Sequence, residues 1–217
     1  MKRFVVVGLG NFGRAVARTL YEQGHEVVAV DTSEAAVDAA GRYATRAALG
    51  DGRNRELLDR LGADAADAAI VSTGDDVTAS ILVTLALRDL GVPRVYCKVI
   101  SDDHRRVMAR LGVDEAVFPE HESGRALGLR LCSGDVFNYL PLGEGVSMQE
   151  LRVPAPWQGR TLRDIQLRPQ FRLVAVAIHN VVKDVLVVPP DPEARLTSED
   201  TLLLAGRDTD LARVVKL

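Results

Sequence analysis

The chain has 217 residues and a formal net charge of −3; hydrophobic residues make up 47% of it and charged residues 26%. These proportions fit a soluble globular protein and exclude a disordered, collagen-like or disulfide-rich chain. Its apolar runs are far shorter than the roughly 20 residues of a membrane-spanning helix, and it lacks the basic excess of a nucleic-acid partner, so we expect a cytoplasmic protein that binds no nucleic acid.

The first 120 residues alternate between short apolar runs and stretches with helical periodicity. The predicted strands cover residues 4–7, 27–30, 46–49, 69–72, 94–98 and 115–118. Helices are expected over residues 12–20, 53–61, 75–90 and 107–111. This alternation predicts βαβ units and a parallel sheet with helices on both faces. The expected fold class is therefore α/β, a Rossmann-type doubly wound sheet.

The composition changes after a predicted helix at residues 121–133, where prolines and glycines become frequent. We place a domain boundary there, giving a nucleotide-binding domain at 1–135 and a small α+β domain at 136–217. The second domain is expected to hold strands at 146–151, 173–179, 185–188 and 201–206, a helix start at 159–165 and a final helix at 208–214. Two cysteines, Cys97 and Cys132, lie in apolar surroundings, which favours reduced, buried thiols.

A glycine motif follows the first predicted strand and opens a helix. Gly8, Gly10 and Gly13 form a Gly-x-Gly-x-x-Gly pattern that also contains Asn11 and Phe12. In this setting the first glycine makes a tight turn, the second lets a pyrophosphate approach the backbone, and the third lets the helix pack against the strand. The N–H groups of the helix start favour phosphates. The motif therefore predicts a nucleotide or dinucleotide site.

Acidic and hydroxyl side chains end the neighbouring strands. Asp31 ends the second strand, where an acid accepts hydrogen bonds from ribose hydroxyls, and it would repel the 2′-phosphate of NADP. Thr32 follows Asp31, and the next residues include no arginine that could bind a 2′-phosphate. Asp51, after the third strand, is either a contact for the base or ribose or an ordinary turn aspartate. Thr73 follows the fourth strand at the same edge of the sheet.

Residues typical of catalysis or metal binding are missing from the pattern. The sequence has no Tyr-x-x-x-Lys pair, no cysteine and histidine spacing that suits zinc, and no Gly-Lys-Ser/Thr phosphate loop. Its four histidines have no evident nucleophile or carboxylate partner, so we expect structural or solvated roles for them. We predict no catalytic residue and no metal site.

Taken together, these residues resemble the RCK/KTN family, which regulates the conductance of potassium channels and transporters. The N-terminal part of the resemblance rests on residues 8–13, Asp31, 50–51 and 118–120, and the C-terminal part on residues 159–164, 173–178, Pro189 and 199–206. The sequence resembles in particular the cytosolic regulatory subunits of Trk/Ktr potassium-uptake systems. The resemblance covers nearly the whole chain, with its motifs in the family's order.

The resemblance implies a site for an adenine nucleotide, which is ATP, ADP, NAD or NADH. The residues that it places at this site are Gly8, Gly10, Asn11, Phe12, Gly13, Asp31, Thr32, Asp51, Gly52, Thr73, Gly74, Lys98 and Glu120. The three motif glycines would line the phosphates and Asp31 would bind the ribose. Lys98 would reach a phosphate, with a solvated strand-end charge as the alternative. Glu120 would face the terminal phosphate, unless it only begins the next helix.

Two features concern which ligands bind. Some relatives that respond to ATP carry arginine where this chain has Asn11, which weakens the case for discrimination between ATP and ADP and leaves NAD or NADH open. Arg14, one turn later, is a potential substitute. In the C-terminal domain some relatives bind cyclic di-AMP, and the matching segment here includes Arg163 and Arg168; surface arginines are the alternative.

The resemblance further implies dimers that assemble into a ring, for which we expect an octamer, bound to an integral-membrane potassium-translocating subunit at the inner face of the cell membrane. The helix at 75–90 is apolar around much of its circumference, which fits a dimer interface or burial within one chain. The leading hypothesis is a regulatory nucleotide sensor and not an enzyme. A small NAD-dependent oxidoreductase explains the glycine motif equally well, but not the missing acid and base residues. A subunit of another transporter or channel is the third possibility.

Overall fold

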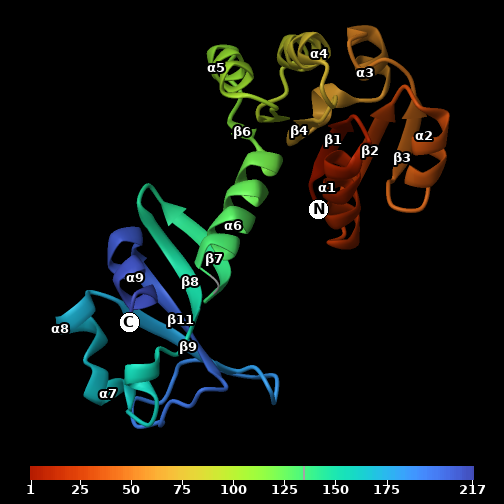
Figure 1. Ribbon diagram of the computed structural model, residues 1–217. Coiled ribbons are helices and arrows are strands. Elements are labelled where there is room, and N and C mark those ends of the chain that lie inside the picture. The colour runs from red at the N-terminus through yellow and green to blue at the C-terminus, as the bar shows by residue number, and fades with distance from the viewer. Residues whose placement is uncertain (134) are drawn as a thin grey trace. The chain divides into compact units, whose positions relative to one another are not determined.

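The computed structural model describes residues 1–133 and 135–217, except the side chains of residues 129, 132 and 133. It contains two compact units, Met1–Glu120 and His121–Leu217 (Figure 1). This division falls near the start of helix α6 (Pro119–Ser133), whereas the sequence places the boundary after residue 135. The expectation for Cys132 lies outside the described side chains. In the described part of the chain, no helix is long and apolar enough to cross a membrane.

The first unit is the expected doubly wound sheet. Its strands are β1 (Arg3–Val7), β2 (Glu26–Asp31), β3 (Arg46–Leu49), β4 (Ala68–Val71), β5 (Val95–Lys98) and β6 (Glu115–Val117). They pair in the order β3-β2-β1-β4-β5-β6, and every pairing is parallel. The helices are α1 (Asn11–Glu22), α2 (Glu34–Ala40), α3 (Arg55–Arg60), α4 (Val77–Asp89) and α5 (Asp102–Arg110), with a 3-10 turn at Ala63–Ala65. The predicted strands are confirmed to within one residue at each end.

Burial on both faces of the sheet explains the continuous apolar strands. In the central strands, Val5, Val28 and Ala69 are fully buried. Helices α2 to α5 each begin after a residue whose side chain caps them: Asp76, for example, accepts a hydrogen bond from the backbone N–H of Ala79 at the start of α4. As the sequence predicts, Cys97 is buried and unpaired, and burial raises the pKa of its thiol to about 12.

The second unit is built on a five-stranded antiparallel sheet in the order β10-β9-β11-β8-β7. Its strands are β7 (Val136–Gly143), β8 (Val146–Arg152), β9 (Val174–Asn180), β10 (Val185–Val187) and β11 (Asp200–Arg207). Its helices after α6 are α7 (Leu162–Ile165), α8 (Leu167–Phe171) and α9 (Asp208–Val215), with a 3-10 turn at Ala155–Trp157. The sequence-based prediction missed β7 and α8.

The reason for missing β7 is its composition. Pro141 and Gly143 suggest a loop, yet β7 lies at one edge of the sheet, where a residue without a backbone N–H is tolerated. The predicted start of α7 is confirmed, because Thr161 and Asp164 form a reciprocal capping box. The helix itself is only one turn long.

Glu150 of β8 joins three other strands of this sheet through its carboxylate. One oxygen accepts hydrogen bonds from Thr201 Oγ1 of β11 at 2.6 Å and from His179 Nδ1 of β9 at 3.0 Å. The other accepts from Asn138 Nδ2 of β7 at 2.5 Å. Burial alone would raise the pKa of Glu150, but these hydrogen bonds together hold its pKa below the ordinary value. The charged carboxylate is therefore part of the folded sheet.

Candidate functional site

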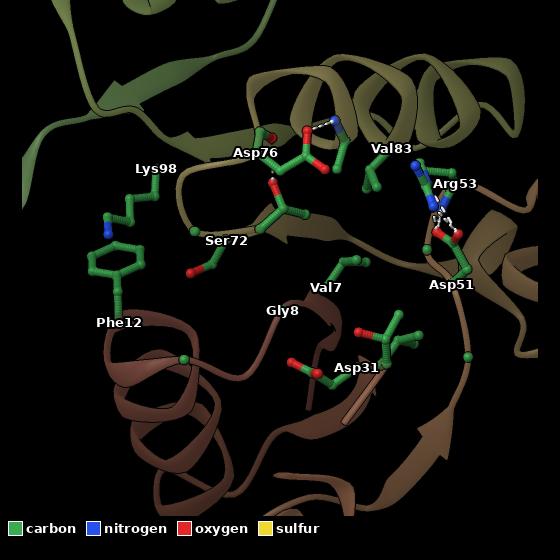
Figure 2. A pocket seen from close by; sticks show the side chains of 18 of the residues that line it. Val7, Gly8, Phe12, Asp31, Asp51, Arg53, Ser72, Asp76, Val83 and Lys98 are labelled. Atoms are coloured by element: carbon green, nitrogen blue, oxygen red, sulfur yellow. Dashed lines mark hydrogen bonds and ion pairs between the residues drawn. The ribbon is translucent and has the colours of Figure 1, made fainter. Parts of the chain in front are cut away.

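A cavity of about 510 Å³ lies at the carboxyl edge of the parallel sheet. β1 pairs with β2 on one side and with β4 on the other, so chain connections leave this edge in opposite directions. Such a crevice is where ligands bind in doubly wound folds. Figure 2 shows Gly8, Asp31 and Ser72 around it, with Phe12 and Lys98 on one side and Asp51 and Arg53 on the other.

The three glycines of the motif have different environments. Gly8 has a φ of +92°, and a Cβ there would lie 2.0 Å from the carbonyl oxygen of Ser72. A Cβ on Gly13 would lie 1.9 Å from the carbonyl oxygen of Gly8, whereas one on Gly10 would meet nothing within 4 Å. Gly10 therefore leaves the space into which a pyrophosphate can fit. Gly13 packs the helix against the turn and does not line the cavity, and its predicted place at the phosphates stays a prediction.

The carboxylate of Asp31 holds the glycine turn as well as facing the cavity. Its Oδ2 accepts a hydrogen bond from the backbone N–H of Leu9 at 2.5 Å, and its Oδ1 accepts one from the N–H of Ser33 at 2.8 Å. Two lone pairs of the carboxylate remain for hydroxyl donors. Asp31 thus fixes the loop that surrounds the phosphates while it offers acceptors to a ribose.

An ion pair occupies the end of β3. Asp51 Oδ2 lies 2.6 Å from Arg53 Nη2, and Arg53 Nε and its backbone N–H also donate to this carboxylate. Hydrogen bonds from Arg53 lower the pKa of Asp51. Beside the pair, a Cβ on Gly52 would lie 2.3 Å from Val7 Cγ1, so a larger residue would push into the cavity wall. Val83 of α4 lines the same end of the cavity.

A second ion pair lies at the opposite end. Lys98 Nζ, at the end of β5, is 2.6 Å from Glu120 Oε1. The lysine side chain is 13% exposed and the glutamate side chain 61% exposed. The hydrogen bond from Lys98 lowers the pKa of Glu120. The sequence analysis left a solvated strand-end charge as the alternative for Lys98 and a simple helix start as the alternative for Glu120. Neither alternative includes the ion pair that the two residues form.

Asn11 lines the cavity at the start of α1, but Arg14 does not. Arg14 is exposed, and its Nη2 donates to Asn11 Oδ1 at 3.0 Å. The arginine therefore contacts Asn11 itself, on the outside of the helix. It does not take the place of an arginine at position 11 in this structure.

All predicted site residues except Gly13 line the cavity. The sequence reasoning missed Arg53, Asp76, Ala79 and Val83, which also line it. Arg53 could have been found from its place two residues after Asp51, where an arginine can pair with that carboxylate. The helical period of α4 could have located Ala79 and Val83, because both lie four residues apart on the face toward the sheet.

The predicted cyclic di-AMP segment lies along a groove of the second unit. Arg163 and Arg168 line an open groove of about 410 Å³ with Pro189 and Pro192, and Arg163 Nε lies 2.5 Å from Glu193 Oε1. The predicted cyclic di-AMP site at this segment stays a prediction.

In the part of the chain that the structure describes, no group of three or more histidine, cysteine, aspartate or glutamate residues could hold a metal ion.

One histidine is buried between two helices. His104 of α5 is 3% exposed, and its Nε2 lies 2.7 Å from Ser80 Oγ of α4. Ser80 Oγ also donates to the carbonyl oxygen of Val77, so it accepts from the Nε2–H of His104. The buried Nδ1 of His104 has no hydrogen-bond partner. Burial lowers the pKa of His104, and its role is structural, as the sequence suggests.

Comparison with known proteins gives the site its context. Residues 4–119 match the TrkA-N domain and residues 148–217 match the TrkA-C domain. The chain is 35% identical over 215 residues to the Ktr system potassium uptake protein C of Bacillus subtilis (strain 168), which covers 99% of this chain and 96% of that protein. The chain belongs to the family of Ktr and Trk potassium uptake proteins.

A second Ktr protein and one solved structure are also similar to this chain. The Ktr system potassium uptake protein A of the same organism is 31% identical over 212 residues, with 98% of this chain and 95% of that protein covered. The solved structure of the GsuK channel bound to NAD has the same fold, with a TM-score of 0.54, 22% identity, and coverage of 100% of this chain and 39% of that chain. The predicted resemblance to RCK proteins and the predicted fold class are confirmed.

Proposed function

We propose that this Ktr/Trk family member is a nucleotide-binding regulatory subunit of a potassium-uptake system. The observation that carries the proposal is the cavity at the carboxyl edge of the sheet. Its glycine turn, the open space over Gly10 and the carboxylate of Asp31 suit a nucleotide. The cavity belongs to a chain that is similar to potassium uptake proteins over almost its whole length.

The ligand that we propose is an adenine nucleotide, either ATP or ADP or NAD or NADH. The N–H groups at the start of α1 bind its phosphates. Lys98 releases Glu120 and pairs with the terminal phosphate instead. Asp31 accepts hydrogen bonds from the ribose and disfavours NADP. The GsuK channel, which shares this fold, binds NAD, and this supports a dinucleotide as the ligand. Asn11 offers no positive charge, so we expect weak discrimination between ATP and ADP.

Regulation follows from differential binding, because a nucleotide shifts an assembly only as far as it prefers one of its states. We propose a homo-oligomer, with dimers assembled into an octameric ring. Leu82 and Leu85 of α4 are 42% and 41% exposed, so this face suits a partner copy. The ring would bind an integral-membrane potassium-translocating subunit at the inner face of the cell membrane. Cyclic di-AMP at the groove of Arg163 and Arg168 would be a second regulatory ligand.

Thermal unfolding of the purified protein with ATP, ADP, NAD, NADH and NADPH tests the proposal. A ligand present at 100 times its dissociation constant adds about 2.7 kcal/mol of stability. We expect stabilisation by adenine nucleotides, little by NADPH, and no consumption of any of them over hours. Sustained turnover of NADH with carbonyl substrates would favour the oxidoreductase instead. Capture of a potassium-translocating protein from membranes separates this proposal from a subunit of another transporter.

A further inference from the structure

The order of the strands indicates where each part of a bound nucleotide lies. The phosphates belong at the start of α1, which follows β1, and the ribose belongs at Asp31, which ends β2. β3 lies beyond β2 in the sheet, so the base belongs at the end of β3. Asp51 and Arg53 are there, on the side of the cavity opposite Phe12 and Lys98 (Figure 2).

The carboxylate of Asp51, at the expected place of the base, already accepts hydrogen bonds from Arg53. Both oxygens of Asp51 accept hydrogen bonds from the Arg53 side chain, at 2.6 to 3.0 Å, and Oδ1 also accepts the backbone N–H of Arg53. A carboxylate has about four acceptor positions. Arg53 therefore uses most of the capacity that an exocyclic amine would need. The arginine itself keeps N–H groups that Asp51 does not take, on Nη1 and Nη2.

The two kinds of purine differ at the edge that this pair would meet. Adenine presents an exocyclic amine, whose N–H a free carboxylate can accept, beside the acceptor N7. A 6-oxopurine presents an oxygen and N7, both acceptors, which suits the paired N–H groups of an arginine. Val7 and Val83, which line the cavity near the pair, have apolar side chains that form no hydrogen bond able to distinguish the two rings.

We propose that Arg53 sets the base specificity of this site: by occupying Asp51 it removes the preference for adenine, so that adenine and 6-oxopurine nucleotides bind with similar affinity. The proposal rests on the proposed function, because it concerns the base of the same nucleotide. It assigns a role to a residue that neither the glycine motif nor Asp31 requires.

Calorimetric titration of the full chain with ADP, inosine diphosphate and guanosine diphosphate tests this. Inosine diphosphate carries an oxygen where ADP carries its amine. In the unmodified protein we expect affinities for the three within about threefold of one another. In Arg53→Ala the free Asp51 should favour ADP over inosine diphosphate by about tenfold, equal to about 1.4 kcal/mol. Arg55→Ala is the matched control, since Arg55 is exposed and does not line the cavity.

The outcomes separate the two proposals. A tenfold preference for ADP in the unmodified protein, or a ratio that Arg53→Ala leaves unchanged, overturns the role of Arg53 while the proposed function stands. If none of the three nucleotides, nor NAD or NADH, binds the unmodified protein, the proposed function itself fails. A ratio that changes equally in Arg55→Ala shows a general effect of charge and also overturns the role of Arg53.

Discussion

Asp31→Ala should destabilise the protein even when no nucleotide is present. The backbone N–H of Leu9 donates to Asp31 at 2.5 Å, and Leu9 is only 4% exposed, so removal of the carboxylate leaves a largely buried donor without its acceptor. Such a loss costs about 1–3 kcal/mol. The second donor, the N–H of Ser33, lies in an exposed environment, where water replaces the lost acceptor at little cost.

The free energy of unfolding should therefore fall by about 1–3 kcal/mol. For a chain of this length, each kcal/mol lowers the unfolding temperature by about 2–4 °C. Circular dichroism of the nucleotide-free protein during heating measures this change in unfolding temperature. Asp31→Asn should lose less, because its amide keeps one acceptor oxygen. Glu34→Ala, at an exposed position in the first turn of α2, is the control and should stay within about 0.5 kcal/mol. If Asp31→Ala unfolds at the temperature of the unmodified chain, Asp31 does not hold the glycine turn.

Four other substitutions test three separate features of the structure. Gly13→Ala should cost about 3 kcal/mol or more in a urea titration, because its Cβ would lie 1.9 Å from a backbone oxygen, whereas Gly10→Ala should fold normally and lose nucleotide affinity in calorimetry; equal stability of the two would contradict the packing role. Burial lowers the pKa of His104, so its contribution to stability should decline as the pH falls below about 6.5, and His104→Asn should flatten that decline in urea titrations from pH 5 to 8. The hydrogen bond to Glu150 raises the pKa of His179, so its contribution is present below about pH 6.5 and is lost as the pH rises through the raised pKa; a His179→Asn protein with the same pH profile as the unmodified chain would refute this.

Sequence periodicity predicted the first unit well because its signals are local. The strands of a parallel sheet covered on both faces are continuous apolar runs, and the glycine motif fixes both the turn and the start of α1. The second unit was harder, since β7 contains Pro141 and Gly143 and is a strand only because it pairs with β8 at one edge. No local pattern contains that pairing.

The candidate site shows the same limit. Gly8, Asp31 and Asp51 stand at predictable places, directly after strands of one sheet. The contacts that define their chemistry do not follow from spacing. That Lys98 pairs with Glu120, and that Arg53 folds back onto Asp51, depends on side-chain directions that only the three-dimensional structure gives.

The carboxylate of Glu150 has a consequence for how the second sheet assembles. Its partners come from β7, β9 and β11, so one side chain on β8 marks the alignment of four strands at once. A strand that slipped by one residue would turn its partner group to the other face, and a slip by two would carry it about 7 Å away. Either error would leave a charged, largely buried oxygen without its donor. Glu150 therefore adds a polar constraint on the register of these strands to the one that their hydrophobic pattern already imposes.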